Sequence, residues 1–68
     1  MSGDVLEGKW KQARGKIKQW WGDVTDDDLD RIKGRRDELI GVIQEKYGYT
    51  RERAEREVDA RLQELDDE

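Results

Sequence analysis

Apolar residues recur every three or four positions along most of the chain, which is the spacing of one buried face of an α-helix. In the first third of the chain this stripe runs through Leu6, Trp10, Ala13, Ile17 and either Trp20 or Trp21. No segment alternates apolar and polar residues with the period of two that a half-buried β-strand needs. The pattern therefore predicts an all-α protein.

Similar stripes predict three more helices, over about residues 26–33, 35–47 and 51–65. Thr25 and Thr50 precede the second and fourth helices, where a threonine hydroxyl caps a helix N-terminus. Gly22 follows the first helix, at the position that favours a left-handed residue, and Gly48 ends the third. Short connections at 22–25 and 48–50 imply that successive helices fold back on each other. We expect a small bundle of four helices with a break at Gly34; one helix continuing through Gly34 is the alternative.

Six of the seven glycines follow a frame that repeats after 26 residues. Within each copy they are seven positions apart: Gly8, Gly15 and Gly22, then Gly34, Gly41 and Gly48. In this alignment Ile17 falls on Ile43, and Trp21 falls on Tyr47. The chain therefore resembles a duplicated unit of one helix and one turn. We expect Gly41 to let another helix approach closely.

The composition limits the size of the core and the chemistry available. Only 32% of the 68 residues are hydrophobic and 47% are charged, against about half and a quarter in an average domain. We expect a single domain over residues 1–68, with frayed ends at about 1–4 and 66–68. The chain has no cysteine and no histidine. This excludes the usual zinc sites, cysteine and Ser-His nucleophiles, and haem ligation, so we expect no cofactor and no enzymatic activity.

Nothing in the sequence indicates a membrane span or a secretory signal. A spanning helix needs about 20 predominantly apolar residues, and a signal peptide needs an apolar block of 7–15 residues. The longest apolar runs here contain two residues each, as at 20–21, 39–40 and 42–43. We therefore expect no transmembrane segment and a cytoplasmic location.

Asp26, Asp28 and Asp30 imitate the first three ligands of a calcium-binding EF-hand loop. The sixth position of such a loop is glycine and the twelfth is glutamate, but this chain has Arg31 and Asp37 there. Acidic residues in the first turn of a helix are explained by the helix dipole without a metal. We interpret these acids as part of a helix N-terminus.

Charge is unevenly spread along the chain. Residues 1–22 carry a net charge of +3, and residues 23–68 carry −7. This asymmetry favours either a site for an anionic partner or, the interpretation we prefer, packing of the basic segment against the acidic remainder. Adjacent residues on a helix point about 100° apart, so one of the neighbouring indoles at 20 and 21 should be partly exposed. If a weak anionic partner exists, a nucleic acid or an acidic protein, the candidate contact surface is Lys11, Arg14, Lys18, Trp20 and Trp21.

Several strings in the chain resemble one known family. They are GKWKQ at 8–12, GKIK at 15–18, WGDVTDDD at 21–28, GRRDELIGVIQ at 34–44 and YGY at 47–49. They resemble the CsbD-like family of bacterial stress-response proteins, and the string at 21–28 with YGY is closer still to the subgroup typified by YjbJ. The resemblance covers about residues 4–60. It implies two αα-hairpins packed crosswise, as in sterile-alpha-motif domains, and induction under general stress.

The family has no established catalytic activity, so the resemblance implies no catalytic residues. Two functional hypotheses follow. The first is a non-catalytic general stress-response protein that acts through abundance, hydration or weak interactions. The alternative is a small adaptor that binds nucleic acid or another protein through the basic first helix and its tryptophans.

Overall fold

The computed structural model describes residues 6–66 and is all-helical over that range. Its elements are α2 (Trp10–Trp20), α3 (Asp26–Ile32), α4 (Arg36–Tyr47) and α5 (Arg51–Asp66). Residues 6–8 are also helical and are separated from α2 by a turn at Lys9. The predicted all-α class is confirmed. The predicted frayed ends lie outside the described residues except for Asp66, which is the last residue of α5.

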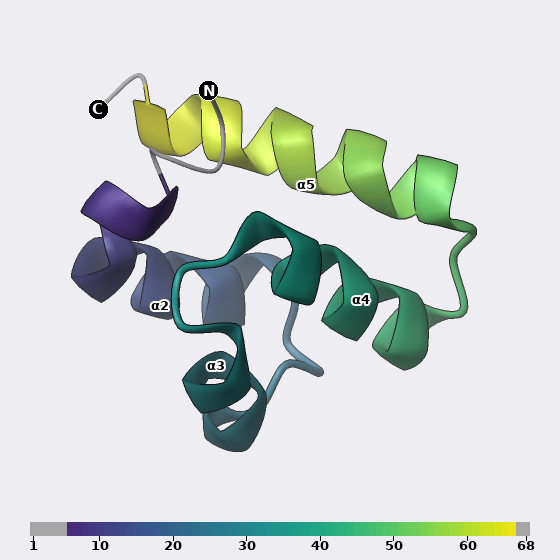
Figure 1. The fold of residues 1–68 in the computed structure, drawn as a ribbon, viewed down its shortest axis with the longest axis horizontal. Helices are drawn as coiled ribbons and strands as arrows, with labels where there is room; N and C mark the ends of the chain where they lie inside the picture. Colours follow the sequence, from purple (N-terminus) through teal and green to yellow (C-terminus); the bar gives the residue numbers. More distant parts are fainter. Residues whose placement is uncertain (1–5, 67–68) are drawn as a thin grey trace.

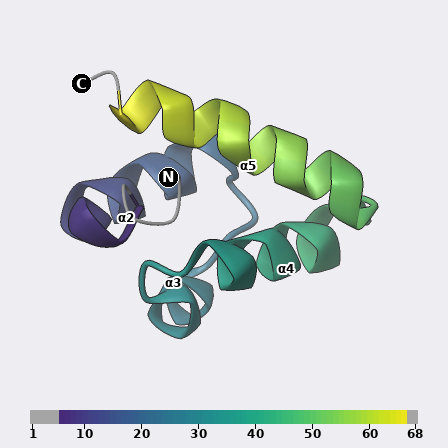
Figure 2. The same cartoon turned by 45° about the horizontal axis from the view of Figure 1, so that its top comes forward.

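The helices form a small bundle around α4. Helix α5 runs alongside α4, and α3 also packs against α4 (Figure 1). Helix α2 lies beside α3 and reaches the C-terminal part of α5, as the turned view also shows (Figure 2). The crosswise packing of two hairpins, implied by the family resemblance, stays a prediction.

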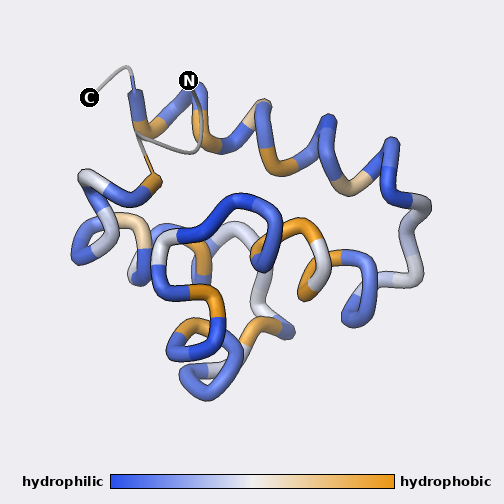
Figure 3. The backbone as a smooth tube through the Cα atoms, viewed as in Figure 1, coloured by the Kyte–Doolittle hydropathy of each residue, from blue (hydrophilic) through white to orange (hydrophobic). Residues whose placement is uncertain are grey.

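All the helices contribute to one apolar core, and the apolar positions of α5 turn toward α4 (Figure 3). Helix α4 contributes four buried side chains and α5 contributes four. Trp10, Trp20, Tyr47 and Tyr49 are partly buried and pack against the core from its edge. The largest fully buried side chains are Leu6, Ile17, Leu29, Ile32, Leu39, Ile40, Ile43, Leu62, Leu65, Val42 and Val58.

The chain breaks between α3 and α4 at two consecutive residues with positive φ. Lys33 has φ 50° and Gly34 has φ 80°, and the N–H of Arg35 donates to the carbonyl of Ile32 at 2.9 Å. A Cβ on Gly34 would lie 3.2 Å from the Cα of Glu7, so both the backbone conformation and the available space favour glycine. The predicted break is confirmed, and the alternative of one continuous helix is wrong.

Two expectations about glycines are wrong. Gly22 is not among the glycines with positive φ, because the end of α2 is closed differently. The N–H of Trp21 donates to Ile17 at 2.8 Å, and the N–H of Val24 donates back to the carbonyl of Trp21 at 3.0 Å. Gly41 does not admit a neighbouring helix, since a Cβ there would meet no surrounding atom within 4 Å.

Candidate interaction surface

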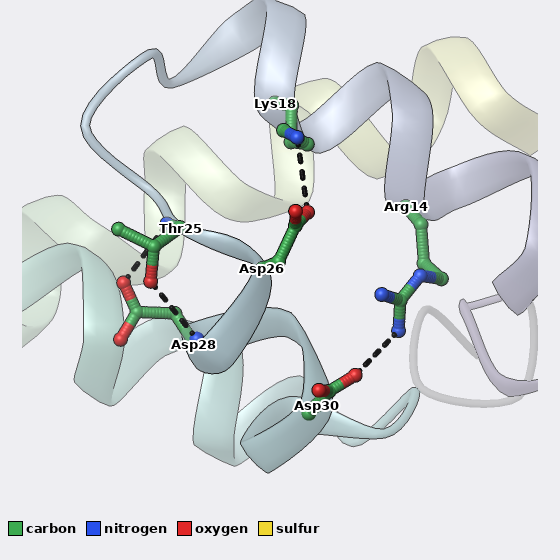
Figure 4. A network of polar contacts seen from close by, with 6 residues as sticks. All are labelled: Arg14, Lys18, Thr25, Asp26, Asp28 and Asp30. Atoms are coloured by element: carbon green, nitrogen blue, oxygen red, sulfur yellow. Dashed lines mark hydrogen bonds and ion pairs between the residues drawn. The ribbon is translucent and has the colours of Figure 1, made fainter.

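The N-terminus of α3 is held by a reciprocal pair of hydrogen bonds. The N–H of Asp28 donates to the Thr25 hydroxyl oxygen at 3.1 Å, and the N–H of Thr25 donates to the Asp28 carboxylate at 3.0 Å (Figure 4). Lys46 of α4 reaches the same carboxylate at 3.0 Å. The bond from the Thr25 backbone is the main reason that the pKa of Asp28 lies below its ordinary value. The predicted cap is therefore confirmed, with Asp28 as its second half.

Two ion pairs join the exposed sides of α2 and α3. Lys18 Nζ lies 2.9 Å from Asp26 Oδ1, and an Arg14 Nη atom lies 3.2 Å from Asp30 Oδ1 (Figure 4). The hydrogen bond from Lys18 lowers the pKa of Asp26. The three aspartates that imitate a calcium loop are thus used for capping and pairing. In residues 6–66 no group of three or more acids could hold a metal ion.

The predicted contact residues fall into three environments. Lys11 is exposed, while Arg14 and Lys18 face the acids of α3. Trp21 is only 5% exposed. Trp20 is partly exposed and meets Trp21 edge-on, with ring centroids 5.8 Å apart. The expectation that one indole of this pair is partly exposed is confirmed, and that indole is Trp20.

Two further polar contacts tie α5 to the segment before α2 and to α4. Lys9 Nζ donates to the carbonyl oxygen of Leu65, near the end of α5, at 3.0 Å. The Arg36 guanidinium makes two bonds to the Asp59 carboxylate, at 2.9 and 3.0 Å, which tie α4 to α5. These bonds are the main reason that the pKa of Arg36 is raised. No local pattern predicts either contact, because each joins residues more than 20 positions apart.

The exposed start of α2 has features that the helical periodicity did not reveal. An open hollow of about 360 Å³ is lined by Glu7, Gly8, Lys9, Trp10, Lys11 and Gln12. The turn between α3 and α4 lies against this stretch through Gly34 and brings two cations with it, Lys33 and Arg35.

Comparison with known proteins assigns the chain. The family model described as CsbD-like matches residues 4–56. A UPF0337 protein of Pseudomonas aeruginosa is 57% identical over 58 residues, which cover 85% of this chain and 89% of that protein. The UPF0337 protein YjbJ of Escherichia coli strain K12 is 53% identical over 58 residues, 85% of this chain and 84% of YjbJ. No solved structure matches the chain. No helix within residues 6–66 has the length and apolar character to cross a membrane.

Proposed function

Since the chain belongs to the CsbD-like family, we propose that it is a non-catalytic protein of the bacterial general stress response. It acts in the cytoplasm, through abundance, hydration and weak interactions rather than through a reactive site. The surface supports this role, because 47% of the residues are charged and ionised groups bind water strongly.

One observation carries the non-catalytic part of the proposal. Asp28 is the one charged residue buried within residues 6–66, at 8% exposure. Its carboxylate is committed to the Thr25 cap and to Lys46. General acid–base catalysis at neutral pH needs a carboxyl group whose pKa is raised toward 7, whereas the pKa of Asp28 is lowered. Its environment therefore serves folding.

A deletion strain tests the proposed role. Survival is measured under osmotic, desiccation and acid stress, together with expression of the protein before and after each stress. We expect lower survival of the deletion strain and restoration by the wild-type gene. A destabilised Ile43→Ala chain serves as the control for dependence on the fold. Normal survival together with unchanged expression under every stress would contradict the proposal.

The adaptor role of the first helix is the second candidate, supported by the net charge of +3 over residues 1–22. Its proposed surface consists of Lys11, Arg14, Lys18 and Trp20. Trp21 is almost fully buried and supports Trp20 from the core through their edge-on contact. Docking there requires Arg14 and Lys18 to release their partners on α3. Charge reversal of all three cations should abolish capture of an anionic partner and leave the melting temperature within a few degrees. Unfolding of that triple variant would show that the cations hold the bundle together instead.

The finer architecture belongs to the same proposal. We propose that α2 with α3, and α4 with α5, are two hairpins packed crosswise in the manner of sterile-alpha-motif domains. The internal repeat supports this, since α2 begins at Trp10 and α4 begins 26 positions later at Arg36. An experimental structure in solution checks the crossing angle of the two hairpins.

A further inference from the structure

Two cations of α2 face two acids of α3 in a regular register. Arg14 and Lys18 lie one helical turn apart, and so do their partners Asp30 and Asp26. The closest atoms are 3.2 Å apart in the pair of Arg14 with Asp30 and 2.9 Å apart in the other pair (Figure 4). The hydrogen bond from Lys18 is the main reason that the pKa of Asp26 is lowered, and the charge of Arg14 adds a smaller contribution. The two cations therefore act together on anions placed one helical turn apart.

Both ion pairs are exposed, so their partners can be exchanged. The side chains of Arg14 and Lys18 are 36% and 49% exposed, and those of Asp30 and Asp26 are 68% and 71% exposed. An exposed ion pair shifts an equilibrium by only about 1.5- to 5-fold. Helix α3 itself is held by its N-terminal cap and by two buried aliphatic side chains. The acids can therefore leave the cations by side-chain rotation while the two helices stay packed.

An indole lies at the end of this row of cations. Trp10 precedes Arg14 by one turn of α2, and the guanidinium carbon of Arg14 lies 5.9 Å from the centroid of the Trp10 ring. Trp10 is only partly buried, and it lines the hollow of about 360 Å³ together with Lys11. Lys11 is exposed and has no partner in the described part of the chain. This end of α2 thus combines positive charge, an aromatic surface and open space.

We propose that Arg14 and Lys18 bind phosphates of a single-stranded nucleic acid, and that Asp26 and Asp30 mask this site in the free protein. Surfaces that bind single strands combine cations that follow the backbone with aromatic rings on which bases stack. The carboxylates of α3 occupy the places where the phosphates would lie, and a base would stack on Trp10 in the hollow. The inference rests on the adaptor role proposed above for the first helix, and it names the partner and the control of that surface.

The indole favours a nucleic acid over an acidic protein as the partner. An acidic protein offers carboxylates to the cations but leaves Trp10 without a stacking partner, whereas a nucleotide strand offers both phosphates and bases. Residues 23–68 carry a net charge of −7, and Glu7 lines the hollow, so long-range repulsion keeps the binding weak. A local mask is effective under these conditions, because two phosphate contacts are a large part of a weak affinity.

Neutralisation of the two masking acids should strengthen binding. The probe is a fluorescein-labelled oligothymidylate of about 12 nucleotides, titrated with the full chain at about 20 mM salt and followed by fluorescence anisotropy. We expect Asp26→Asn with Asp30→Asn to raise the affinity about fivefold to tenfold. The matched control, Asp27→Asn with Glu52→Gln, changes the net charge equally at exposed acids that have no partner within residues 6–66. It should raise the affinity by less than about twofold, and thermal melting verifies that both variants are folded.

Further substitutions in the unmasked variant identify the residues that bind. Arg14→Gln with Lys18→Gln should abolish the gain in affinity. The same pair should also make the logarithm of the affinity depend less steeply on the logarithm of the salt concentration, by about 1.4 for two phosphates. Trp10→Leu should weaken binding without changing that slope, because stacking releases no counterions.

The outcomes separate the mask from the adaptor role on which it rests. Binding by the unmasked variant alone, or stronger binding by it than by the control, would support both. If the wild type binds and the unmasked variant gains no more than the control, the mask is wrong while the adaptor role stands. If no variant binds even at low salt, the adaptor role is wrong and the mask falls with it. Binding that survives the loss of Arg14 and Lys18 would overturn the proposed site, and tighter binding of polyglutamate than of the oligonucleotide would overturn its nucleic-acid part.

Discussion

The first helices of the two copies of the 26-residue frame, α2 and α4, differ in how they are held in place. In the first copy, α2 buries only Ala13 and Ile17 among its own residues, and two exposed ion pairs join it to α3. In the second copy, α4 and α5 each bury four apolar side chains. Exposed ion pairs contribute about 0–1 kcal/mol each, whereas a fully buried aliphatic side chain contributes about 1.5–3 kcal/mol. Helix α3 adds the buried Leu29 and Ile32 to the first copy, so the difference lies in the first helix of each copy: α2 is held by few buried residues of its own, and α4 by many.

Truncation of the matched isoleucines gives the largest expected difference between the two copies. Ile17 and Ile43 occupy equivalent positions and are both fully buried. We expect Ile43→Ala to lower the free energy of unfolding by about 4 kcal/mol and Ile17→Ala by about 2–3 kcal/mol. Because so small a core supplies about 3–5 kcal/mol in total, the first variant should be largely unfolded at 25 °C. Urea denaturation measures both free energies of unfolding. Equal losses in the two variants would show that α2 and α4 depend equally on their buried isoleucines.

The first glycines of the two copies should respond oppositely to alanine. Gly34 has φ 80° and lies close to the backbone of Glu7, whereas a Cβ on Gly8 would meet nothing within 4 Å. We expect Gly34→Ala to destabilise the protein by about 2 kcal/mol. Gly8→Ala should be neutral or stabilising by less than about 1 kcal/mol. Thermal melting distinguishes the two, and a loss at Gly8 as large as that at Gly34 would contradict the assigned geometry.

Asp28 links the two copies, since it caps α3 and binds Lys46 of α4. We expect Asp28→Asn to lower stability by about 1 kcal/mol at neutral pH. The folded-state pKa of Asp28 lies below its ordinary value of 3.8. Its contribution is therefore complete above pH 3.8 and is lost as the pH falls through the folded-state pKa. Denaturation curves at pH 7 and pH 2.5 should show the gap between wild type and variant closing in acid; a constant gap would exclude this linkage.

Alanine substitution at the middle glycine of each copy should have the smallest effect on stability, and the effect should be the same in both copies. Gly15 and Gly41 both lie inside helices, and a Cβ on either would meet no surrounding atom within 4 Å. Alanine at each position should stabilise the protein by about 0.5–1 kcal/mol, because glycine loses more backbone entropy on folding. Melting temperatures of the two single variants and the double variant check this expectation. A loss of stability in Gly41→Ala would indicate that another helix packs closely against Gly41, and it would contradict the open space around this residue.

Local signals in the sequence were sufficient for the helices and most of their ends. Thr25 followed by acids predicted the cap of α3, and Gly34 and Gly48 predicted the break after α3 and the end of α4. The prediction of a left-handed Gly22 was wrong because α2 ends at Trp21, with φ −130° and ψ 89°, and not at a left-handed residue. Similarly, the adjacent indoles could not be told apart until the position of α5 set Arg61 over Trp20.

The candidate surface was less predictable than the fold. Helical spacing placed Lys11, Arg14 and Lys18 on one face, but it could not show that acids of α3 meet two of them. The turn at Gly34 lies against the start of α2, a contact that helical spacing also could not show. Contacts between separate segments decide which charges remain unpaired, and those contacts depend on packing that the linear pattern does not encode.

The bond from Lys9 to the carbonyl of Leu65 has a consequence for the order of folding events. It joins residues 56 positions apart, so closing that loop costs more chain entropy than forming any helix or turn within it. We expect local helices to form first and this contact to close near the end of the folding reaction. An interaction absent from the transition state governs the rate of unfolding alone. We therefore expect that removal of the Lys9 side chain speeds unfolding of the bundle without slowing its folding.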